Sequence, residues 1–476
     1  MIRATFNDKR TIVLGVVCLT LLFLLAVNQR YEECILVSLL IPSFLAIIYG
    51  LRRIESLYWL SVFLAPISFS VEALGGVALK FPIEIMIIII PFIVIIKWIF
   101  GDSSQNAIDF RHPINILLVL QLTWLLVVSL SSEMPEVSLK RWLMSLVFVI
   151  GYCGLFQKLI KRNPQRLFQL YGWGLLVPMM LIFIKHSEYD FNQATSFIMA
   201  RPFYDEHTVY GACLAFIIPY FAIFSIDKQK INFANLLMLV VLLFALITSY
   251  SRASWLSLLM AFAIMVMLKI GLKFWHFVIG LSIGAMIVGF NFSNYYEELR
   301  SNEVKYGNNV TQHFSSITNL QNDASNLERI NRWVCAIRMA NDKPLQGFGP
   351  GTYQFIYDRY QTKEYMTRIS THKGDMGNAH SEYLNSLAEQ GIPGMLMYVS
   401  LVFCSLFYGM NSYHKLKDRT SKKIVLAAVL GLITFFIHGL FNTFSDISEM
   451  AILIYGSLGI ILFYSSDKSD SNLIID

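Results

Sequence analysis

Charged residues are scarce in this 476-residue chain, and their scarcity excludes a large class of proteins. Asp, Glu, Lys and Arg together make up 15% of the sequence, hydrophobic residues make up 55%, and the mean hydropathy is +0.55. Soluble domains carry about 25% charged residues, because their surfaces face water. The composition therefore excludes a soluble globular domain and predicts a protein that crosses a membrane many times.

Cysteine pairs, metal-ligand spacings and nucleotide motifs are also lacking. Six cysteines are scattered along the chain, and Cys335 is the only one within residues 293–392, so that segment cannot form an internal disulfide. No Cys/His spacing matches a zinc site, since His372 and His380 are too far apart to form a helical pair. A GxxxxGK[ST] phosphate loop is absent. We therefore expect no metal, no cofactor and no direct use of ATP.

Long apolar runs dominate what is present. A helix needs about 20 apolar residues to cross roughly 30 Å of hydrocarbon, and in lipid the backbone finds partners only within a helix or a closed barrel. The sequence thus predicts an all-α polytopic membrane protein with 12–14 transmembrane helices, because some of the fourteen candidate runs are short. The candidate spans are 11–28, 34–50, 56–70, 83–100, 114–131, 141–160, 167–184, 208–226, 233–250, 253–268, 274–292, 393–411, 424–442 and 449–464.

A polar segment of about a hundred residues, 293–392, interrupts these spans. It divides the chain into a predicted transmembrane bundle, 1–292, a loop domain, 293–392, and a C-terminal part, 393–476, with further spans and a short tail. A loop this long is uncommon unless it is functional or disordered. Helix signals, Trp333 and several arginines argue against disorder, so we expect the loop domain to carry the chemistry.

Lysine and arginine are concentrated in alternate connections, which predicts the orientation. Cytoplasmic loops retain positive charge and exported short loops lose it. The bias places both termini in the cytoplasm and residues 293–392 outside, and it accounts for the net charge of +6 without a nucleic-acid partner. No small-x-small cleavage pattern follows the first span, so we expect that span to remain as a helix.

The first polar patch on the outer side is MARPFYDEHTVYG, residues 199–211. It places Arg201, Asp205, His207 and Tyr210 at the expected water boundary, where they are candidates for substrate binding. A juxtamembrane loop with tyrosine anchors explains the same pattern equally well.

The second patch is TSYSRASW, residues 248–255, which divides an apolar run of 35 residues from Ala234 to Leu268. One span cannot hold so many residues, so we expect a turn near Ser251 and Arg252. An arginine at this depth costs several kcal/mol unless it is solvated or paired, and ionisable residues inside a membrane are often functional. Arg252 and Tyr250 are therefore candidates, and snorkelling of Arg252 to lipid headgroups is the alternative.

The third patch lies within the loop domain. A helix is predicted from Ser325 to about Asn341, with Arg329, Arg332 and Trp333 on or near its first turns. Its predicted apolar face consists of Ile330, Val334 and Ile337. Arginines on such a helix are usually just solvated, so Arg329 and Arg332 are candidates only in combination with the other patches.

Two further motifs follow in the loop domain. In QGFGPG, residues 346–351, Gly347 and Gly349 allow close backbone approach to a phosphate, although a plain turn explains them equally well. His380 precedes a short helix predicted over residues 381–390, where the helix dipole favours a neutral imidazole that can accept a proton. Its neighbours Asn378 and Glu382 are candidates for substrate binding, and a hydrogen-bonded structural histidine is the alternative reading of His380.

Together these stretches resemble the O-antigen ligase superfamily, which also includes O-antigen polymerases and some protein O-oligosaccharyltransferases. The matching pieces are SRASW at 251–255, ERINRWVCAIRMANDKPLQGFGPGTY at 328–353 and AHSEYLNSLAEQGIPG at 379–394. Residues 205–211 depart from the family pattern, which often has an asparagine-containing segment there. The roles of Asp205 and His207 therefore stay open.

The resemblance implies a metal-independent glycosyltransferase of GT-C-like architecture in the bacterial inner membrane, with its active site facing the periplasm. By position, Arg252 and Arg329 would contact the diphosphate of a polyprenyl-linked glycan, and His380 would be the essential histidine. Arg329 is the match rather than Arg332, because the family arginine lies four residues before the tryptophan. We expect His380 to act as a base on the acceptor hydroxyl.

The two functions that the resemblance leaves open differ in the acceptor of the glycan. An O-antigen ligase would use the lipid A core, and a polymerase would use another lipid-linked repeat unit; we favour the ligase. A flippase for lipid-linked oligosaccharides is the alternative from another class, because such transporters can also have fourteen spans. Internal repeats and midplane charges typical of transporters are not evident in the sequence.

Overall fold

The fold was analysed in a computed structural model that describes residues 49–72, 78–99, 111–159, 163–227, 230–280, 324–366, 370 and 377–466, together with isolated positions between 282 and 290. Helices dominate these residues, and the strands form two small antiparallel hairpins. The chain is therefore an all-α polytopic membrane protein, as predicted. Two predicted spans, 11–28 and most of 34–50, lie outside the described residues.

The elements follow the chain in a simple order. The first half contains a helix over residues 49–64, η1 (Ala65–Ile67), β1 (Phe69–Glu72), β2 (Ala78–Phe81), α3 (Ile83–Ile99), α4 (Pro113–Leu130), α5 (Pro135–Phe148), η3 (Val149–Gly154), α6 (Leu155–Leu159), α7 (Arg166–Ser187) and α8 (Gln193–Met199). The second half contains α9 (His207–Phe224), β3 (Ile226–Asp227), β4 (Lys230–Ile231), α10 (Phe233–Thr248), α11 (Arg252–Lys269), α14 (Ala324–Asp342), α15 (Tyr353–Ile356), η5 (Tyr357–Tyr360), α16 (Glu382–Lys415), α17 (Arg419–His438) and α18 (Ser448–Ser465).

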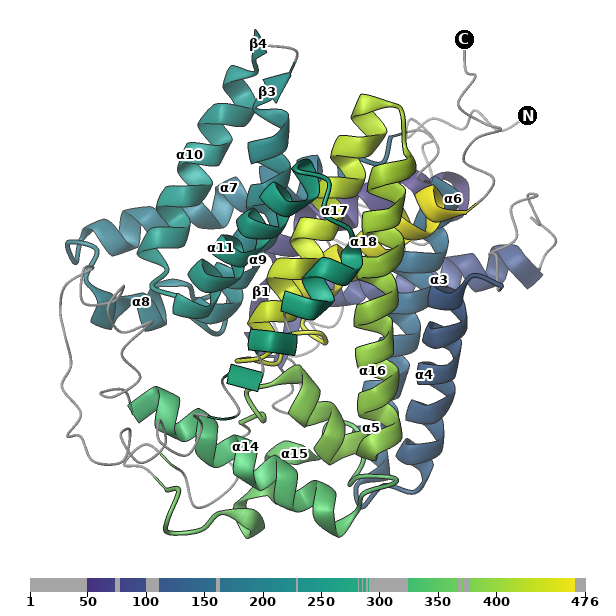
Figure 1. The fold of residues 1–476 in the computed structure, drawn as a ribbon, viewed down its shortest axis with the longest axis vertical. Coiled ribbons are helices and arrows are strands. Elements are labelled where there is room, and N and C mark those ends of the chain that lie inside the picture. The colour runs from purple at the N-terminus through teal and green to yellow at the C-terminus, as the bar shows by residue number, and fades with distance from the viewer. Residues whose placement is uncertain are drawn as a thin grey trace, which may run out of the picture.

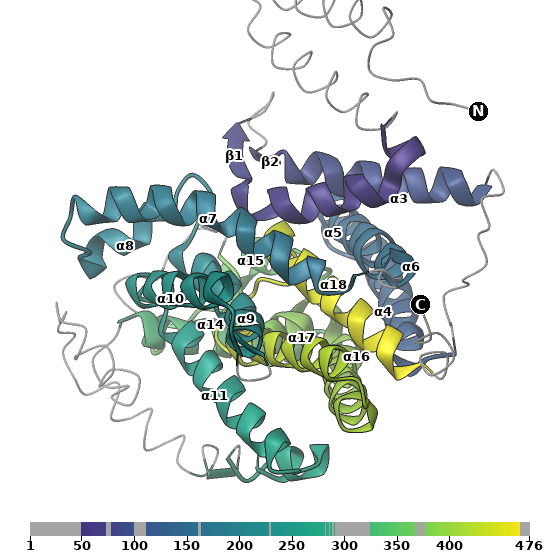
Figure 2. The same ribbon diagram turned by 90° about the horizontal axis from the view of Figure 1, so that it is seen from above.

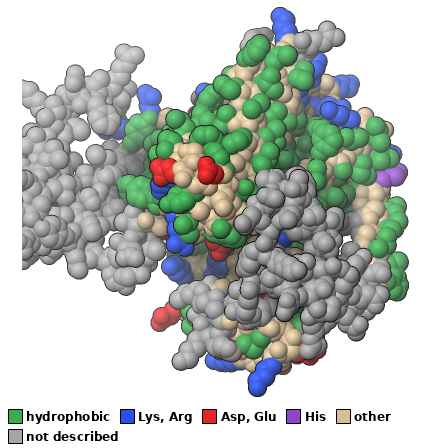
Figure 3. All heavy atoms as spheres, turned by 90° about the vertical axis from the view of Figure 1, so that its left-hand side faces the viewer, with side chains coloured by type: hydrophobic (Ala, Val, Ile, Leu, Met, Phe, Trp, Pro, Cys, Tyr) green, Lys and Arg blue, Asp and Glu red, His purple; other side chains and the backbone are tan. Residues whose placement is uncertain are grey.

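Eight helices among the described residues are long and apolar enough to cross a membrane. They are Pro113–Leu130, Pro135–Gln157, Arg166–Ser187, His207–Phe224, Arg252–Lys269, Glu382–Lys415, Arg419–His438 and Ser448–Ser465. Shorter apolar helices, including α10 and α3, add to them. Hydrophobic side chains cover much of the bundle face in Figure 3, with lysines and arginines at its upper end, as expected of a surface in contact with lipid.

The core of the bundle is formed by α9, α17 and α18, in which most side chains are buried. Helix α17 packs against α9, α11, α16 and α18. In Figure 1 the loop helices α14 and α15 lie at the lower end of the bundle, and the β3–β4 hairpin lies at the opposite end. Figure 2 shows α4, α5 and α16 nearly end-on, whereas α3 and α7 lie across the view. We call the end that carries α14 and α15 the loop end.

Some predicted boundaries are wrong for identifiable reasons. The span predicted at 56–70 is instead a helix over residues 49–64, because Pro66 stops it and β1 begins at Phe69. The span predicted at 141–160 begins too late, because α5 begins at Pro135, and Arg141 inside α5 forms an ion pair with Asp446. A hydropathy criterion placed the start of both helices too late, because it leaves out charged residues that lie in the first turns of a helix.

The helices of the loop end form a small core of their own. Cys335, Ala336 and Met339 of α14 are buried there with residues of α15, whereas Ile337 is 45% exposed, so the predicted apolar face is only partly right. This small core docks on the turn between α4 and α5, where Ser132 Oγ donates to the carbonyl of Phe348 at 3.0 Å.

Helix α16 joins the loop end to the bundle. Ser381 caps it, Glu382 begins it, and Gly391 interrupts it with φ 70°. The predicted short helix to Gln390 and the following span are thus continuous through a kink at Gly391, a position where φ of this sign favours glycine.

Candidate active site

The turn predicted around Arg252 is confirmed. Helix α10 ends at Thr248, Tyr250 adopts φ 52°, and α11 begins at Arg252 after its N-cap, Ser251. The Tyr250 hydroxyl donates to the carbonyl of Phe191 at 2.8 Å, which ties this turn to the segment after α7. Arg252 therefore sits at the first position of a membrane-spanning helix, at the loop end.

Arg329 reaches the same region from α14. Its Nε donates to the carbonyl of Phe441 at 3.3 Å, and its Nη1 donates to Asn326 Oδ1 at 3.0 Å. Burial lowers the pKa of Arg329, and the carboxylate of Glu206 opposes that shift. Arg329 lies within electrostatic range of Arg252. Guanidinium groups stay protonated in proteins, so two positive charges from distant stretches, both half-buried, lie within electrostatic range of each other.

Two histidines lie beside this arginine pair. His207, the first residue of α9, interacts electrostatically with both arginines. His438, the last residue of α17, interacts with Arg329 and His207. The Nδ1 atom of His438 lies 3.3 Å from Ser254 Oγ, and its buried Nε2 atom has no hydrogen-bond partner among the described residues.

His438 was not among the residues predicted from the sequence. It lies inside the predicted span 424–442, in which it is the only ionisable side chain. The rule that an ionisable residue within a membrane span is a functional candidate would have found it.

His380 is held one helical turn along α14 from Arg329. Its backbone has φ 49°, its N–H donates to Asn378 Oδ1 at 2.9 Å, and its carbonyl accepts from the Trp333 indole at 3.2 Å. The Trp333 ring also lies 6.5 Å from the ring of Phe441, whose carbonyl accepts from Arg329. The same stretch of α14 therefore positions both Arg329 and the His380 backbone.

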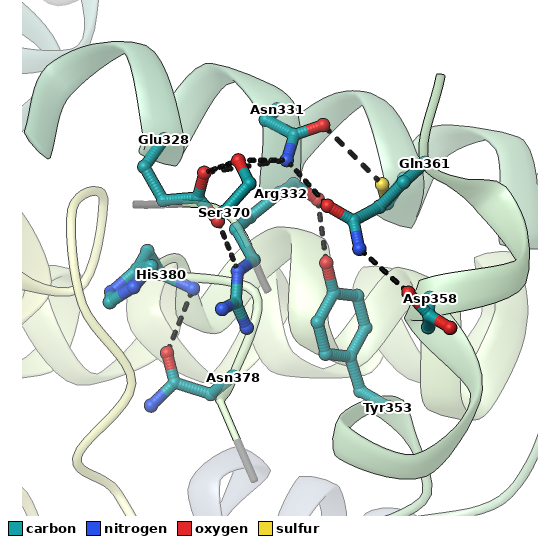
Figure 4. Close-up of polar contacts among 10 residues, drawn as sticks. Glu328, Asn331, Arg332, Tyr353, Asp358, Gln361, Ser370, Asn378 and His380 are labelled. Atoms are coloured by element: carbon teal, nitrogen blue, oxygen red, sulfur yellow. Dashed lines mark hydrogen bonds and ion pairs between the residues drawn. The ribbon is translucent and has the colours of Figure 1, made fainter. Parts of the chain in front are cut away.

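Arg332 belongs to a different network, which Figure 4 shows. Its Nε donates to Glu328 Oε1 at 2.9 Å, and its guanidinium lies 4.2 Å from the centre of the Tyr357 ring. A side chain at Gly377 would collide with this guanidinium. Arg332 thus packs against Gly377, in the segment that leads to His380, and its charge is paired with Glu328 within the loop domain.

The two glycines of the 346–351 segment face helices instead of the arginine pair. Gly347 packs against the backbone of α16, and Gly349 packs against Ser132 and Ser138. The N–H groups of Gly347, Phe348 and Gly349 donate to the carbonyls of Lys343, Ala388 and Glu389. These donors are occupied by protein, so the plain-turn explanation fits better than a phosphate loop.

The 199–211 patch is divided by the fold. Asp205 accepts from Ser70 Oγ at 3.1 Å and pairs with Lys80 at 3.5 Å. Lys80 also pairs with the buried Glu449 at 2.7 Å. Arg201 is exposed. Tyr210 was expected at the water boundary, which is wrong: it is 3% exposed because it packs beside Tyr204 inside the bundle.

Glu382 holds the segment between α17 and α18 in place through hydrogen bonds. Its buried carboxylate accepts from the N–H groups of Phe444 at 2.5 Å and Ser445 at 2.6 Å, and from Ser445 Oγ at 2.9 Å. The same segment contributes the Phe441 carbonyl to Arg329. We call residues 439–447 the α17–α18 segment.

Taken together, the residues at the loop end could bind an anion and place a histidine beside it. Among the described residues no group of three or more His, Cys, Asp and Glu side chains could hold a metal ion. Fold and site thus define a polytopic membrane protein with a cationic, histidine-bearing site at one end of its helices.

A comparison with protein families identifies the class more closely. The family model described as O-antigen ligase matches residues 237–399, which include α11, α14 and the first half of α16. Over these residues the chain is similar to the O-antigen ligase family, and this similarity supports the resemblance and indicates a membrane enzyme of glycosyl transfer of the O-antigen ligase or polymerase type. No curated protein matches the chain.

Proposed function

We propose that this protein transfers a glycan from a polyprenyl diphosphate onto an acceptor hydroxyl at the periplasmic face of the bacterial inner membrane. The convergence of Arg252 and Arg329, from α11 and α14, is the observation that carries the proposal. Two like charges that lie near each other while half-buried cost free energy, because they repel each other and each is partly removed from water. A bound diphosphate compensates both charges and accepts bidentate hydrogen bonds from each guanidinium.

The reaction follows from this arrangement. The acceptor oxygen attacks the anomeric carbon of the donor sugar, and the bond from that carbon to the diphosphate oxygen breaks with inversion. The diphosphate leaves with the bonding electron pair, and the arginines stabilise its developing charge. His380 takes the proton of the acceptor hydroxyl, a role that typically contributes about 10²–10⁴-fold. No metal is needed in this scheme.

An apolar cavity near the loop end suits the isoprenoid chain of the donor. It has a volume of about 170 Å³ and lies between α7, α9 and α10. Apolar side chains line most of it, and its lining also includes Tyr210 and Thr248, the last residue of α10, which lies four residues before Arg252. A lipid chain in this cavity would keep its diphosphate close to the arginine pair.

Reconstitution tests the proposed function directly. The purified protein in detergent would be incubated with a polyprenyl diphosphate glycan and either lipid A core or a second lipid-linked glycan, without divalent metal. We expect a glycan joined to one of these acceptors, with free polyprenyl diphosphate released in equal amount. Absence of any transfer by a protein that still binds inorganic diphosphate would contradict the enzymatic proposal.

The acceptor distinguishes ligase from polymerase, and we favour the lipid A core. Lipopolysaccharide from a strain that lacks the gene would be separated on a gel. Loss of long glycan with accumulation of lipid-linked polymer supports the ligase. A core that carries a single repeat unit supports the polymerase.

A further inference from the structure

A second cavity lies at the loop end, between α4, α5, α16, α17 and α18. Its volume is about 110 Å³, and a single water molecule needs only about 10–15 Å³ measured in this way. The cavity can therefore hold a ring-sized molecule. The α17–α18 segment, whose Phe441 carbonyl accepts from Arg329, supplies Thr443, Ser445 and Asp446 to its lining.

Several buried polar atoms at this cavity have no partner among the described residues. They are Asn385 Oδ1, Ser386 Oγ, Gln390 Oε1, Tyr398 Oη and Thr443 Oγ1. Four of these side chains are no more than 9% exposed. A buried polar group without a hydrogen bond costs about 1–3 kcal/mol, so a ligand that hydrogen-bonds to several of them is favoured. All five are neutral amide oxygens or hydroxyl groups.

The charged groups of this cavity are already paired with protein. Glu389 accepts from the Tyr353 N–H and from Asn385 Nδ2, each at 3.0 Å, and Glu382 is bonded to the α17–α18 segment. Arg141 forms an ion pair with Asp446. Two buried carboxylates repel phosphate, so this cavity disfavours the anionic ligand that the arginine pair favours.

We propose that this cavity binds a neutral sugar ring of the acceptor. Hydroxyls of a sugar both donate and accept, which suits amide oxygens and hydroxyl side chains, and its C–H faces suit apolar residues such as Phe148 and Tyr455 of the lining. The assignment to an acceptor, rather than to any saccharide, rests on the proposed function. It also follows from position, because Glu382 of this cavity is two residues after His380.

Binding to purified full-length protein tests the cavity without requiring turnover. The probes are four methyl glycosides, of glucose, galactose, rhamnose and N-acetylglucosamine, each titrated against the midpoint of thermal unfolding, Tm. Inorganic diphosphate serves as a separate probe of the arginine pair. Tyr398→Phe and Ser386→Ala each remove one hydroxyl from the cavity.

Matched controls are available in the same bundle. Tyr58 and Ser457 carry buried hydroxyls without partners among the described residues, and neither lines the cavity. We expect at least one glycoside to raise Tm, with half-saturation moved to about 3–10-fold higher concentration by Tyr398→Phe or Ser386→Ala, the loss of one hydrogen bond. Tyr58→Phe and Ser457→Ala should leave it unchanged, and the diphosphate response should be equal in all variants.

Each contrary result has a distinct meaning. Failure of every glycoside to raise Tm, or equal losses in cavity and control variants, overturns the saccharide site. Glycoside binding without a diphosphate response retains the saccharide site and overturns the arginine-based proposed function. In transfer assays, Tyr398→Phe should raise KM for the acceptor and leave KM for the donor unchanged; a rise for the donor alone would overturn the acceptor assignment.

Discussion

The arginine pair and the cavity between α4, α5, α16, α17 and α18, which we call the α16 cavity, lie at the same end of the bundle and differ in charge. One concentrates positive charge from Arg252 and Arg329 with histidines beside it. The other presents neutral oxygens around carboxylates that the protein has already satisfied. The contrast teaches that one end of a helical bundle can hold a cationic cluster and a neutral, polar cavity that share one short segment.

The strongest test of this contrast is to remove the imidazole of His380, whose carbonyl accepts from Trp333 on the helix that carries Arg329. His380→Ala should lower kcat by about 10²–10⁴-fold, because general-base assistance is lost. Since His380 has φ 49°, His380→Asn is the better-tolerated companion, as asparagine accepts this backbone conformation. Rates would be measured in the reconstituted transfer assay, with diphosphate and glycoside binding expected to persist.

His414→Ala is the matched control for that variant, because His414 is exposed at the opposite end of α16. It should transfer glycan at the rate of the unmodified protein. Near-normal turnover by His380→Ala would remove this residue from the mechanism.

Loss of one guanidinium should affect only the cationic site. Arg329→Gln is expected to lower the transfer rate by about 10²–10³-fold and to weaken diphosphate binding, because one stabilising donor of the leaving group is gone. Arg329→Lys should recover part of the loss, since it keeps the charge without the planar fork. Diphosphate and glycoside titrations of Tm measure the two sites separately.

Arg338→Gln controls for charge removal on the same helix. Arg338 donates to the carbonyl of Tyr360 within the loop domain at 3.1 Å. A diphosphate affinity equally reduced in Arg329→Gln and Arg338→Gln would show that the site responds to net charge and not to the position of Arg329.

Substitution of Arg332 should affect the stability of the protein and leave diphosphate binding unchanged. Arg332→Gln breaks the buried ion pair with Glu328 and should lower the free energy of unfolding by about 3–5 kcal/mol. Diphosphate should still bind to the folded protein with unchanged half-saturation, because Arg332 belongs to the loop network. Denaturant unfolding and Tm titration measure the two effects; weakened diphosphate binding with normal stability would reverse this assignment.

The smallest expected effect is at Asp205. The Asp205 side chain is 64% exposed and Lys80 keeps its pair with Glu449, so Asp205→Asn should change the free energy of unfolding by about 0–1 kcal/mol. Neither diphosphate nor glycoside binding should change in Tm titrations, since Asp205 faces Lys80. Glu449→Gln, which removes the buried partner of Lys80, should destabilise much more.

Turns and helix ends that are determined by residues next to them in the chain could be predicted from the sequence. The turn at Arg252 was predictable because 35 apolar residues exceed one span, and the end of the short helix at residue 390 coincides with the interruption of α16 at Gly391. The sequence could not show which side chains meet. The family resemblance favours Arg329 over Arg332, but only the structure shows that Arg329 contacts Phe441 whereas Arg332 lies over Tyr357.

The α16 cavity was hidden from sequence reasoning for a similar reason. Asn385, Ser386 and Thr443 are ordinary residues whose importance arises from burial without partners, a property of three dimensions. Tyr210 shows the opposite error, since a tyrosine near a predicted span end suggested an interface and lies instead in the interior.

The α17–α18 segment has a thermodynamic consequence. Phe441 binds Arg329 through its carbonyl, and Phe444 and Ser445 bind Glu382 through their N–H groups, so one short stretch of backbone forms a wall shared by the two sites. A ligand that shifts this segment when it binds at one site changes the affinity for ligand at the other site. Thermodynamic linkage requires each ligand to change the affinity for the other by the same factor. Titrating diphosphate with and without a saturating glycoside would give that coupling as a single number.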